Sequence, residues 1–412
     1  METIYLLVLE IITVGIVYHY LSFYFSIFLA SIFVGINICI RGKQGAIISL
    51  FLIIFLLNSV RTISYSQLQI GENIEIKTEL KLGFGKIQSI DRKYPKENLY
   101  VSMDKIPDGK VEMKGEVIKI SRDRYGRIVY RINPMEYKEI EDNKIKVYLE
   151  NRVEWLTENY SRKLKNMYKA ILLGDSQALD LEIKNKFKYL GISHLLVISG
   201  LHLSIIIATI VYILKKLPIK REFEIGGGII FLTIYVVGLG ATPSILRAYI
   251  MAVIYLLGKI VYEKSDSKKS LALAYVFTLL IYPNWFTNIS FVLSYVAVFA
   301  ILFVHPYIPK LKNFKSKYIK YLYKNITLIL TIQLLMTPIF IYNFKSFPVL
   351  AFIPNFFLVP IGSLLITTAF VSLLLSNIYI GIFLMPGVNL IFNIFLFCVD
   401  IFSKLPYLTL EI

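Results

Sequence analysis

Long apolar runs alternate with short polar segments along most of this chain. Three runs lie near the N-terminus, and eight more follow a long polar stretch, at about 3–18, 20–40, 45–60, 192–214, 225–241, 245–262, 270–283, 288–305, 325–343, 349–375 and 378–401. A helix needs roughly 20 apolar residues to cross a bilayer, so the pattern predicts a polytopic α-helical membrane protein with about ten or eleven spans. Pro354 and Pro360 fall inside the run at 349–375, which predicts a broken or re-entrant helix there.

The polar stretch that starts at residue 61 has a different pattern, in which apolar and polar residues alternate with period two. The alternation is clear in segments that begin at Asn73, Lys110, Arg127 and Lys144, and glycine-containing turns lie between them. Segments of this kind are typical of β-strands. Five or six short strands in about 80 residues predict a small all-β domain, a barrel or a sandwich, with an OB-like barrel as one form.

From Glu150 the apolar residues recur at three- and four-residue steps, for example at Trp155, Leu164 and Ile171. This spacing predicts amphipathic helices that either lie at the membrane surface or pack against the small β domain. The predicted organisation is therefore N-terminal transmembrane helices at 1–60, an OB-like domain at 61–149, interfacial helices at 150–190 and a transmembrane domain at 191–412.

Composition strengthens the membrane assignment. Hydrophobic residues make up 56% of the 412 and the mean hydropathy is +0.63, both higher than a soluble domain of this length shows. Cys39 and Cys398, the two cysteines, both lie in apolar runs, so they predict neither a disulfide framework nor a zinc site. We expect no bound metal and no cofactor, and because the sequence has no P-loop motif, we expect any energy source to be a partner protein.

The net charge of +17 has a simple topological explanation. Lysine and arginine gather in the loops at 41–43, 215–221, 264–269 and 310–324, whereas the alternate short loops near 241–244, 283–288 and 344–348 hold only Lys345. Cytoplasmic loops carry such an excess of basic residues. The pattern predicts a multi-pass protein of the bacterial inner membrane with a cytoplasmic N-terminus and with residues 61–169 outside the cytoplasm.

Polar residues interrupt one apolar run in an unusual way. The run Gly191-Ile-Ser-His-Leu-Leu-Val-Ile-Ser-Gly-Leu-His-Leu places two histidines, a serine and two glycines at membrane depth. Such groups usually face a protein interior or a water-filled path. His194 and His202 are eight residues apart, so on one continuous helix they would face the same side. Two interpretations remain open: the histidines line a hydrophilic path or gate, or they are hydrogen-bonded inside a helix bundle.

This run, together with others in order, resembles the ComEC competence family. Leu172-Leu-Gly-Asp and the run from Gly191 are similar to its signature. Ala241-Thr-Pro-Ser-Ile-Leu-Arg-Ala is similar to its proline-serine-arginine-alanine motif, and Asn288-Ile-Ser-Phe-Val-Leu-Ser-Tyr-Val-Ala to its leucine-serine helix. Gln333-Leu-Leu-Met-Thr-Pro and Asn355-Phe-Phe-Leu-Val-Pro look like its late elements. The resemblance is strong over about 150–375.

Members of that family are DNA-import channel proteins of bacterial transformation, so the resemblance implies a channel that passes single-stranded DNA into the cytoplasm. It also implies membrane lipids, a cytoplasmic helicase-like ATPase and an outer DNA receptor as partners, while self-association stays open. Many members carry a metallo-β-lactamase-like nuclease domain. This chain has four histidines and no His-x-His-x-Asp-His cluster to hold its metal, so we expect a separate nuclease.

The motifs give a set of candidate channel-lining or gating residues. They are the polar, glycine and proline positions of the matching segments, namely Gly191, His194, Ser199, Gly200, His202, Pro243, Ser244, Arg247, Ser294, Gln333, Pro338, Asn355 and Pro360. Arg247 would either snorkel to the membrane boundary or receive a phosphate at the channel mouth through its planar guanidinium. The prolines are equally compatible with a purely structural role in bent helices.

The β domain supplies a second candidate site. Basic residues beside aromatic rings suit single-stranded nucleic acid, and possible DNA-binding residues are Arg92, Lys93, Arg122, Arg124, Tyr125 and Arg127, with Arg247 in the membrane. The signal is weak, because residues 61–169 hold 23 basic and 17 acidic side chains, and a solvated barrel surface is the alternative.

Two functions of other classes compete with the DNA channel. One is a transporter of another anionic or lipid-linked substrate. The other is a membrane-embedded hydrolase that uses Ser199 with a histidine, which the sequence disfavours because Ser199 has neither a nucleophile elbow nor an evident acidic third member. We therefore predict no enzymatic activity and no catalytic residue.

Overall fold

The structure is a computed structural model in which the chain forms two compact units, residues 1–142 with 275–288, and residues 143–274 with 289–412. The structure describes residues 2–20, 29–30, 32–34, 37, 48–55, 62–63, 69–81, 84–91, 93–95, 99–103, 109–122, 128–139, 143–176, 179–196, 198–240, 242–260, 266–309, 316–344, 346–347, 349–406 and 408–411.

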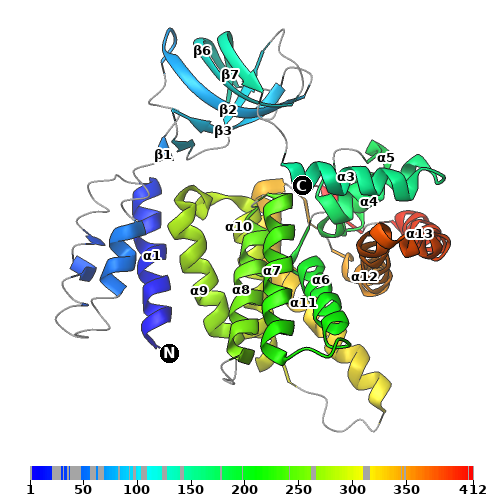
Figure 1. Cartoon of the computed structure of the whole chain (residues 1–412). Coiled ribbons are helices and arrows are strands. Elements are labelled where there is room, and N and C mark those ends of the chain that lie inside the picture. The colour runs from blue at the N-terminus through cyan, green and yellow to red at the C-terminus, as the bar shows by residue number, and fades with distance from the viewer. Residues whose placement is uncertain are drawn as a thin grey trace. The chain divides into compact units, whose positions relative to one another are not determined.

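A closed five-stranded barrel dominates the described part of the first unit (Figure 1). Its strands are β2 (Asn73–Lys81), β3 (Phe84–Ile90), β5 (Leu99–Ser102), β6 (Gly109–Arg122) and β7 (Ile128–Glu139). They pair in the order β2-β3-β5-β7-β6, with β6 closing onto β2. All neighbouring strands are antiparallel except β5 and β7, which run parallel. The barrel prediction is confirmed.

The apolar side chains at alternate positions of the strands fill the interior of the barrel. Ile76, Leu80, Leu99, Val101 and Val111 are fully buried inside it, because successive side chains of a strand point to opposite faces. The long β6 shifts register between Lys114 and Gly115. A Cβ at Gly115 would lie 2.5 Å from the carbonyl oxygen of Asn133, so only glycine fits where the two strands approach.

The rest of the described part of the first unit consists of helical segments and short strands. Helix α1 covers Glu2–Tyr20, and a two-residue parallel pair joins β1 (Thr62–Ile63) to β4 (Tyr94–Pro95). Glu10 in α1 is buried, and its carboxylate accepts hydrogen bonds of 2.9 and 3.2 Å from the amide of Asn37. Helix α9 (Ser267–Ile281) continues from the second unit into the first, where η4 (Pro283–Thr287) follows it.

The second unit is a bundle of helices. It begins with α3 (Lys144–Thr157), α4 (Arg162–Leu173), α5 (Leu181–Tyr189), the 3₁₀ turn η3 (Ser193–Leu195), α6 (Gly200–Leu214), α7 (Arg221–Leu239) and α8 (Pro243–Ile260). After α9 it continues with α10 (Ile289–Phe299), the π turn η5 (Ala300–Val304), η6 (His305–Tyr307), α11 (Lys317–Phe344), β8 (Ser346–Phe347), α12 (Phe352–Leu374), η7 (Leu375–Ile378), α13 (Ile380–Ser403) and β9 (Leu410–Glu411). Strands β8 and β9 pair antiparallel.

Six helical stretches of the described residues are long and apolar enough to cross a membrane, and the protein is a multi-pass membrane protein. They are Arg221–Leu239, Pro243–Ile260, Ile289–Tyr307, Ile319–Asn343, Phe352–Ile378 and Ile380–Ser403. This number is lower than the predicted ten or eleven. The run at 192–214 yields only the 15-residue α6, the run at 270–283 yields the 15-residue α9, and much of 20–40 and 45–60 lies outside the described residues.

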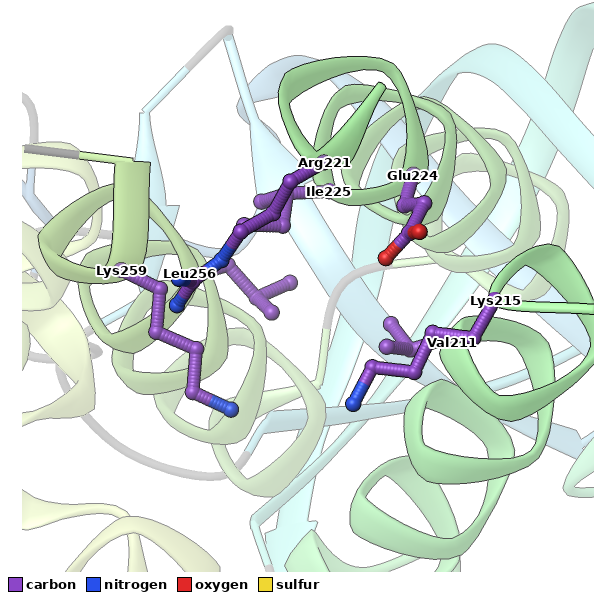
Figure 2. A pocket seen from close by; sticks show the side chains of 7 residues that line it. All are labelled: Val211, Lys215, Arg221, Glu224, Ile225, Leu256 and Lys259. Atoms are coloured by element: carbon purple, nitrogen blue, oxygen red, sulfur yellow. The ribbon is translucent and has the colours of Figure 1, made fainter. Parts of the chain in front are cut away.

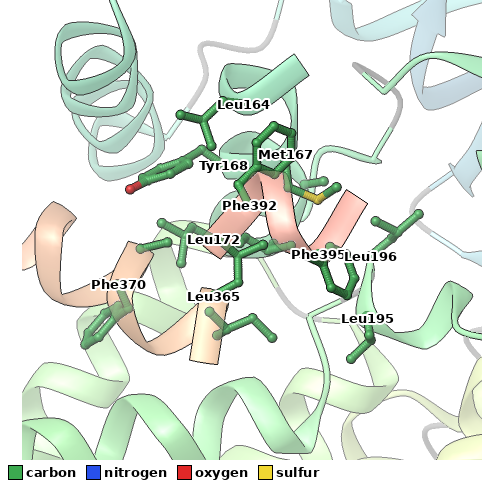
Figure 3. Close-up of a cluster of buried hydrophobic side chains, with 14 of the residues drawn as sticks. Leu164, Met167, Tyr168, Leu172, Leu195, Leu196, Leu365, Phe370, Phe392 and Phe395 are labelled. Carbon is green, nitrogen blue, oxygen red and sulfur yellow. The ribbon is translucent and has the colours of Figure 1, made fainter. Parts of the chain in front are cut away.

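An apolar core of α4, α5, α12 and α13 holds one side of the bundle together (Figure 3). Phe187, Phe392 and Phe395 are almost fully buried there, and the rings of Phe187 and Phe395 meet edge to face with centroids 5.8 Å apart. The hydroxyl of Tyr168 in α4 lies 2.8 Å from that of Ser372 in α12. The buried face of α4 therefore packs on α12 and α13.

Three further predictions of local structure are wrong. Residues 144–149 form the first turns of α3 and not a strand. The amide oxygen of Asn143 caps the helix by accepting from the backbone N–H of Ile145, and Ile145 and Leu149, four residues apart, pack on Gly238 of α7. Helix α12 is continuous through Pro360, so the run at 349–375 is neither broken nor re-entrant. His194 lies in η3 and His202 lies in α6, so the two histidines do not share a helix.

Candidate functional site

The polar segment that begins at Gly191 is a turn followed by a capped helix. Gly191 has a φ of +69°, and a Cβ there would lie 2.8 Å from that of Ala351, so both the backbone conformation and the close approach require glycine. His194 lies in η3, is exposed, and its Nδ1 is 3.3 Å from the carbonyl oxygen of Gly191. His202 lies in α6, so the two histidines occupy different elements.

Ser199 and His202 form a capping box at the start of α6. The Ser199 hydroxyl oxygen accepts a hydrogen bond from the backbone N–H of Leu201 at 3.2 Å. The Nδ1 atom of His202 accepts from the backbone N–H of Ser199 at 3.2 Å and lies 2.9 Å from the Ser199 hydroxyl. These bonds satisfy N–H groups that would otherwise lack partners at a helix start. The serine–histidine contact therefore has a structural role, and it needs no hydrolase to explain it.

The other ring nitrogen of His202 is buried and has no hydrogen-bond partner among the described residues. Because Nδ1 accepts a backbone N–H bond in the neutral ring, the proton is assigned to Nε2, which makes Nε2 a buried donor. Buried polar atoms are normally paired with protein or water. His202 thus offers a hydrogen-bond donor inside the bundle.

Arg247 in α8 is the buried cation of the same region. Only 7% of the residue is exposed. Its Nε donates to the hydroxyl of Ser294 in α10 at 2.8 Å, and its guanidinium lies 5.9 Å from the ring centroid of Tyr295. No carboxylate of the described residues forms an ion pair with it. The prediction that Arg247 snorkels to the boundary is wrong, because its head group lies between helices.

Gly200 brings α6 and the arginine together. A Cβ at Gly200 would lie 2.9 Å from the terminal Nη2 atom of Arg247, so the missing side chain makes room for the guanidinium. We name Ser199, Gly200, His202, Arg247 and Ser294 the polar cluster. It joins α6, α8 and α10 and combines a cation that lacks a carboxylate partner with a buried donor, and both groups favour an anion or an oxygen-rich ligand.

The remaining predicted channel residues lie outside the polar cluster. Pro243 is the first residue of α8, a position that tolerates the missing N–H, and Ser244 follows it. The Nδ2 atom of Asn355 would lie 3.8 Å from a Cβ placed on Gly191. The same nitrogen donates to the carbonyl of Ala351 at 2.7 Å. The Oδ1 atom of Asn355 is buried and has no hydrogen-bond partner among the described residues. The amide of Gln333 donates to the carbonyl of Val349 at 3.2 Å, and Pro338 and Pro360 lie within α11 and α12.

The predicted DNA-binding residues of the barrel divide into two groups. Arg92, Arg124, Tyr125 and Arg127 lie outside the described residues, whereas Lys93 and Arg122 are exposed at the ends of strands. The structure brings together a different outward face, which sequence reasoning missed. Phe84 of β3 and Tyr100 of β5 stack with ring centroids 5.6 Å apart.

Basic side chains flank those two rings. Lys86 pairs with Tyr100 across β3 and β5, and Arg131 of β7 pairs with Ser102 of β5. Lys86 and Arg131 are exposed. We name Phe84, Lys86, Tyr100 and Arg131 the barrel face. The sequence Phe-Gly-Lys at 84–86 could have indicated this face, because residues two apart in a strand point to the same side and an aromatic ring therefore lies beside a lysine.

Comparisons with known proteins agree with these segments. A family model described as Competence protein matches residues 171–412. ComE operon protein 3 of Bacillus subtilis (strain 168) is 32% identical over 192 residues, which are 46% of this chain and 24% of that protein. An uncharacterized protein of Aquifex aeolicus (strain VF5) is 28% identical over 159 residues, 37% of each chain.

The matched regions thus span about a quarter and about a third of these two curated relatives. No solved structure matches the chain. The family model covers more than half of the chain and contains the whole polar cluster. This chain belongs to the Competence protein family.

Proposed function

We propose that this chain is a membrane-embedded channel component that passes single-stranded DNA into the cytoplasm during natural transformation. The observation that carries the proposal is Arg247, a buried guanidinium without a carboxylate partner among the described residues, inside the part of the chain that matches the Competence family. Burial of a lone cation is costly. A passing phosphate would compensate that cost through charge-assisted hydrogen bonds.

The polar cluster suits a polyanion better than it suits a packed interior. DNA cannot cross hydrocarbon, so it needs a path lined by polar groups within the bundle. Arg247 supplies charge, and the Nε2 of His202 supplies a donor nearby in α6. Ser294 holds the guanidinium through Nε, and Nη1 donates to the sulfur of Met251 at 3.6 Å, so Nη2 is the nitrogen that would face a ligand.

The barrel would act before the membrane path. Counting β2, β3, β5, β6 and β7 as strands one to five, the pairing order is one-two-three-five-four, with strands three and five parallel, and this order supports an OB-type barrel. OB folds bind oligonucleotides on the face of their second and third strands. Here these strands carry Phe84, Lys86 and Tyr100 of the barrel face, so bases would stack on rings while phosphates meet cations.

Orientation and partners follow from the same hypothesis. The basic loops at 215–221 and 264–269 would lie in the cytoplasm together with the N-terminus, and the barrel would lie outside. A cytoplasmic helicase-like ATPase would supply the driving force, an outer receptor would deliver the DNA, and a separate polypeptide would degrade the second strand.

Uptake of labelled DNA into a DNase-protected cytoplasmic pool tests the proposal in the chain's own host. Strains with the intact gene, a deletion, and a His194→Ala/His202→Ala replacement are compared. We expect the deletion strain to bind DNA at its surface and to internalise none. Unchanged internalisation in the deletion strain would overturn the proposal and leave transport of another anion as the function of the polar cluster.

A further inference from the structure

A cavity of about 530 Å³ lies between α6, α7 and α8, and none of its lining residues belongs to the polar cluster (Figure 2). It forms where α6 ends, α7 begins and α8 ends, and its charged lining residues are Lys215, Arg221, Glu224 and Lys259. Lys215 is the C-cap of α6, Arg221 is the first residue of α7, and Lys259 is in the last turn of α8. Three helices therefore each contribute a cation to one space.

The charge of the cavity favours an anion. Figure 2 shows the amino groups of Lys215 and Lys259 and the carboxylate of Glu224 directed toward the same open space. Three cations and one carboxylate line the cavity, and within the described part of the chain neither lysine forms an ion pair. The ammonium of Lys259 lies 4.3 Å from the ring centroid of Tyr255, a contact that leaves its positive charge uncompensated by a carboxylate. A phosphate in this space would meet two flexible ammonium groups at once, the arrangement in which lysine binds phosphate as a point charge.

The walls and the surroundings of the cavity are apolar. Val211, Ile225 and Leu256 complete its lining. Tyr212 and Phe223, from α6 and α7, are 63% and 69% exposed. Aromatic side chains concentrate at the headgroup level of a bilayer, and basic pockets between transmembrane helices bind anionic lipid headgroups.

We propose that this cavity binds the phosphate headgroup of an anionic glycerophospholipid, with the acyl chains lying along α6 and α7. The alternative ligand is emerging single-stranded DNA, which uses a continuous basic groove with stacked rings. The observations favour the lipid, because apolar side chains form part of the cavity lining and because the lining includes Glu224, which repels a polyanion but can accept a hydrogen bond from a glycerol hydroxyl. The inference depends on membrane location and not on DNA transport.

Native mass spectrometry of the purified full chain in detergent tests the proposal. The protein is titrated with phosphatidylglycerol and with phosphatidylcholine of the same acyl chains. We expect Lys215→Gln/Lys259→Gln to bind phosphatidylglycerol about tenfold more weakly than the unaltered chain, on the scale of two lost cation–phosphate contacts. Glu224→Gln should bind it more tightly, a change of opposite sign that a misfolded variant would not produce.

A matched control removes two neighbouring charges outside the cavity. Lys216 stacks on Tyr212, with its Nζ 5.2 Å from the ring centroid, and Lys220 precedes α7. Lys216→Gln/Lys220→Gln should keep phosphatidylglycerol affinity within about threefold of the unaltered chain, since only general surface charge is lost. Equal losses in both double variants, or equal affinity for the two lipids, would overturn the proposal.

Inorganic phosphate and a deoxythymidine oligonucleotide serve as competitors and separate the sources of the phosphate. We expect neither to displace phosphatidylglycerol at concentrations at which the lipid saturates the protein. Displacement by the oligonucleotide, with oligonucleotide binding lost in Lys215→Gln/Lys259→Gln, would identify a DNA exit site instead. Displacement by inorganic phosphate alone would show a free-anion site, and the lipid assignment would be wrong.

Discussion

The apolar core of α4, α5, α12 and α13 and the polar cluster of α6, α8 and α10 belong to the same bundle but differ in how they bury their side chains. In the core, Phe187, Phe392 and Phe395 fill space with side chains that leave almost no surface exposed. In the polar cluster, the described residues supply neither a carboxylate partner for the buried Arg247 nor a hydrogen-bond partner for the buried Nε2 of His202. The core is built for stability, whereas the cluster retains charge and donors at a cost in stability, which is typical of a functional site.

Phe392→Ala in α13 is the sharpest test of the stabilising role of the apolar core. Loss of a fully buried aromatic ring leaves a cavity and should lower the free energy of unfolding by about 3–5 kcal/mol. Thermal unfolding of the detergent-solubilised chain measures the change. Phe397→Ala, on the same helix but 65% exposed, is the matched control and should leave stability nearly unchanged; similar losses in both variants would contradict the core assignment.

Arg247→Met should have the opposite effect on stability while it removes function. Replacing a buried charge with an apolar side chain of similar size often raises stability by about 1–4 kcal/mol. Loss of hydrogen bonds to a charged group, about 1.5–3 kcal/mol, should lower DNA internalisation roughly tenfold to a hundredfold. The same unfolding assay and the DNase-protected pool are the two measurements. A destabilised protein with normal internalisation would show that Arg247 is structural.

Gly200→Ala sharpens the comparison further, because it moves the guanidinium without removing it. The new methyl group would lie 2.9 Å from the arginine's terminal nitrogen, and that flexible end can shift. Alanine also suits a helix better than glycine by about 1 kcal/mol, so the fold should be kept. We expect internalisation to fall by less than in Arg247→Met.

Gly226→Ala is the control for the glycine test. Gly226 lies in α7, and nothing lies within 4 Å of a Cβ placed there, so the gain in helix propensity comes without any displacement. Internalisation should match that of the unaltered chain. Equal internalisation in both alanine variants would show that the position of the guanidinium near α6 is unimportant.

The sequence predicted the barrel and most helices because their patterns are local. Period-two alternation located β2, β6 and β7, and apolar runs located α7, α8, α11 and α13. The strand predicted at 144–149 was wrong because the period-two pattern competes with the four-residue spacing of Ile145 and Leu149, and packing of α3 on Gly238 decides between them.

The candidate site was predicted in its residues but not in its geometry. The motifs named every member of the polar cluster. The contact between Gly200 and Arg247, however, joins two helices through residues 47 positions apart in the sequence and depends on tertiary packing. The capping box of Ser199 and His202 exists because α6 begins inside an apolar run. Hydropathy alone does not show where within such a run a helix begins. Lys215 and Arg221 of the cavity between α6, α7 and α8 were interpreted as topology signals, and Lys259 was not singled out, because the sequence does not show that three helix ends converge.

The smallest expected effect concerns an exposed carboxylate of α3 that forms ion pairs with two lysines of α4. Glu154 of α3 lies 2.9 Å from the ammonium of Lys169 and 3.1 Å from that of Lys165 in α4, and hydrogen bonds from Lys169 and then Lys165 lower the pKa of the Glu154 carboxyl. A lowered pKa in the folded state gives stability that is present at neutral pH and is lost as the pH falls through the folded-state value. Because the carboxylate is about half exposed, solvent screening limits the contribution to less than about 1 kcal/mol. Glu154→Gln should therefore lower the unfolding temperature slightly at pH 7 and not at all at a pH below the folded-state pKa, whereas an equal loss at both pH values would show that packing, and not charge, is what the substitution removes.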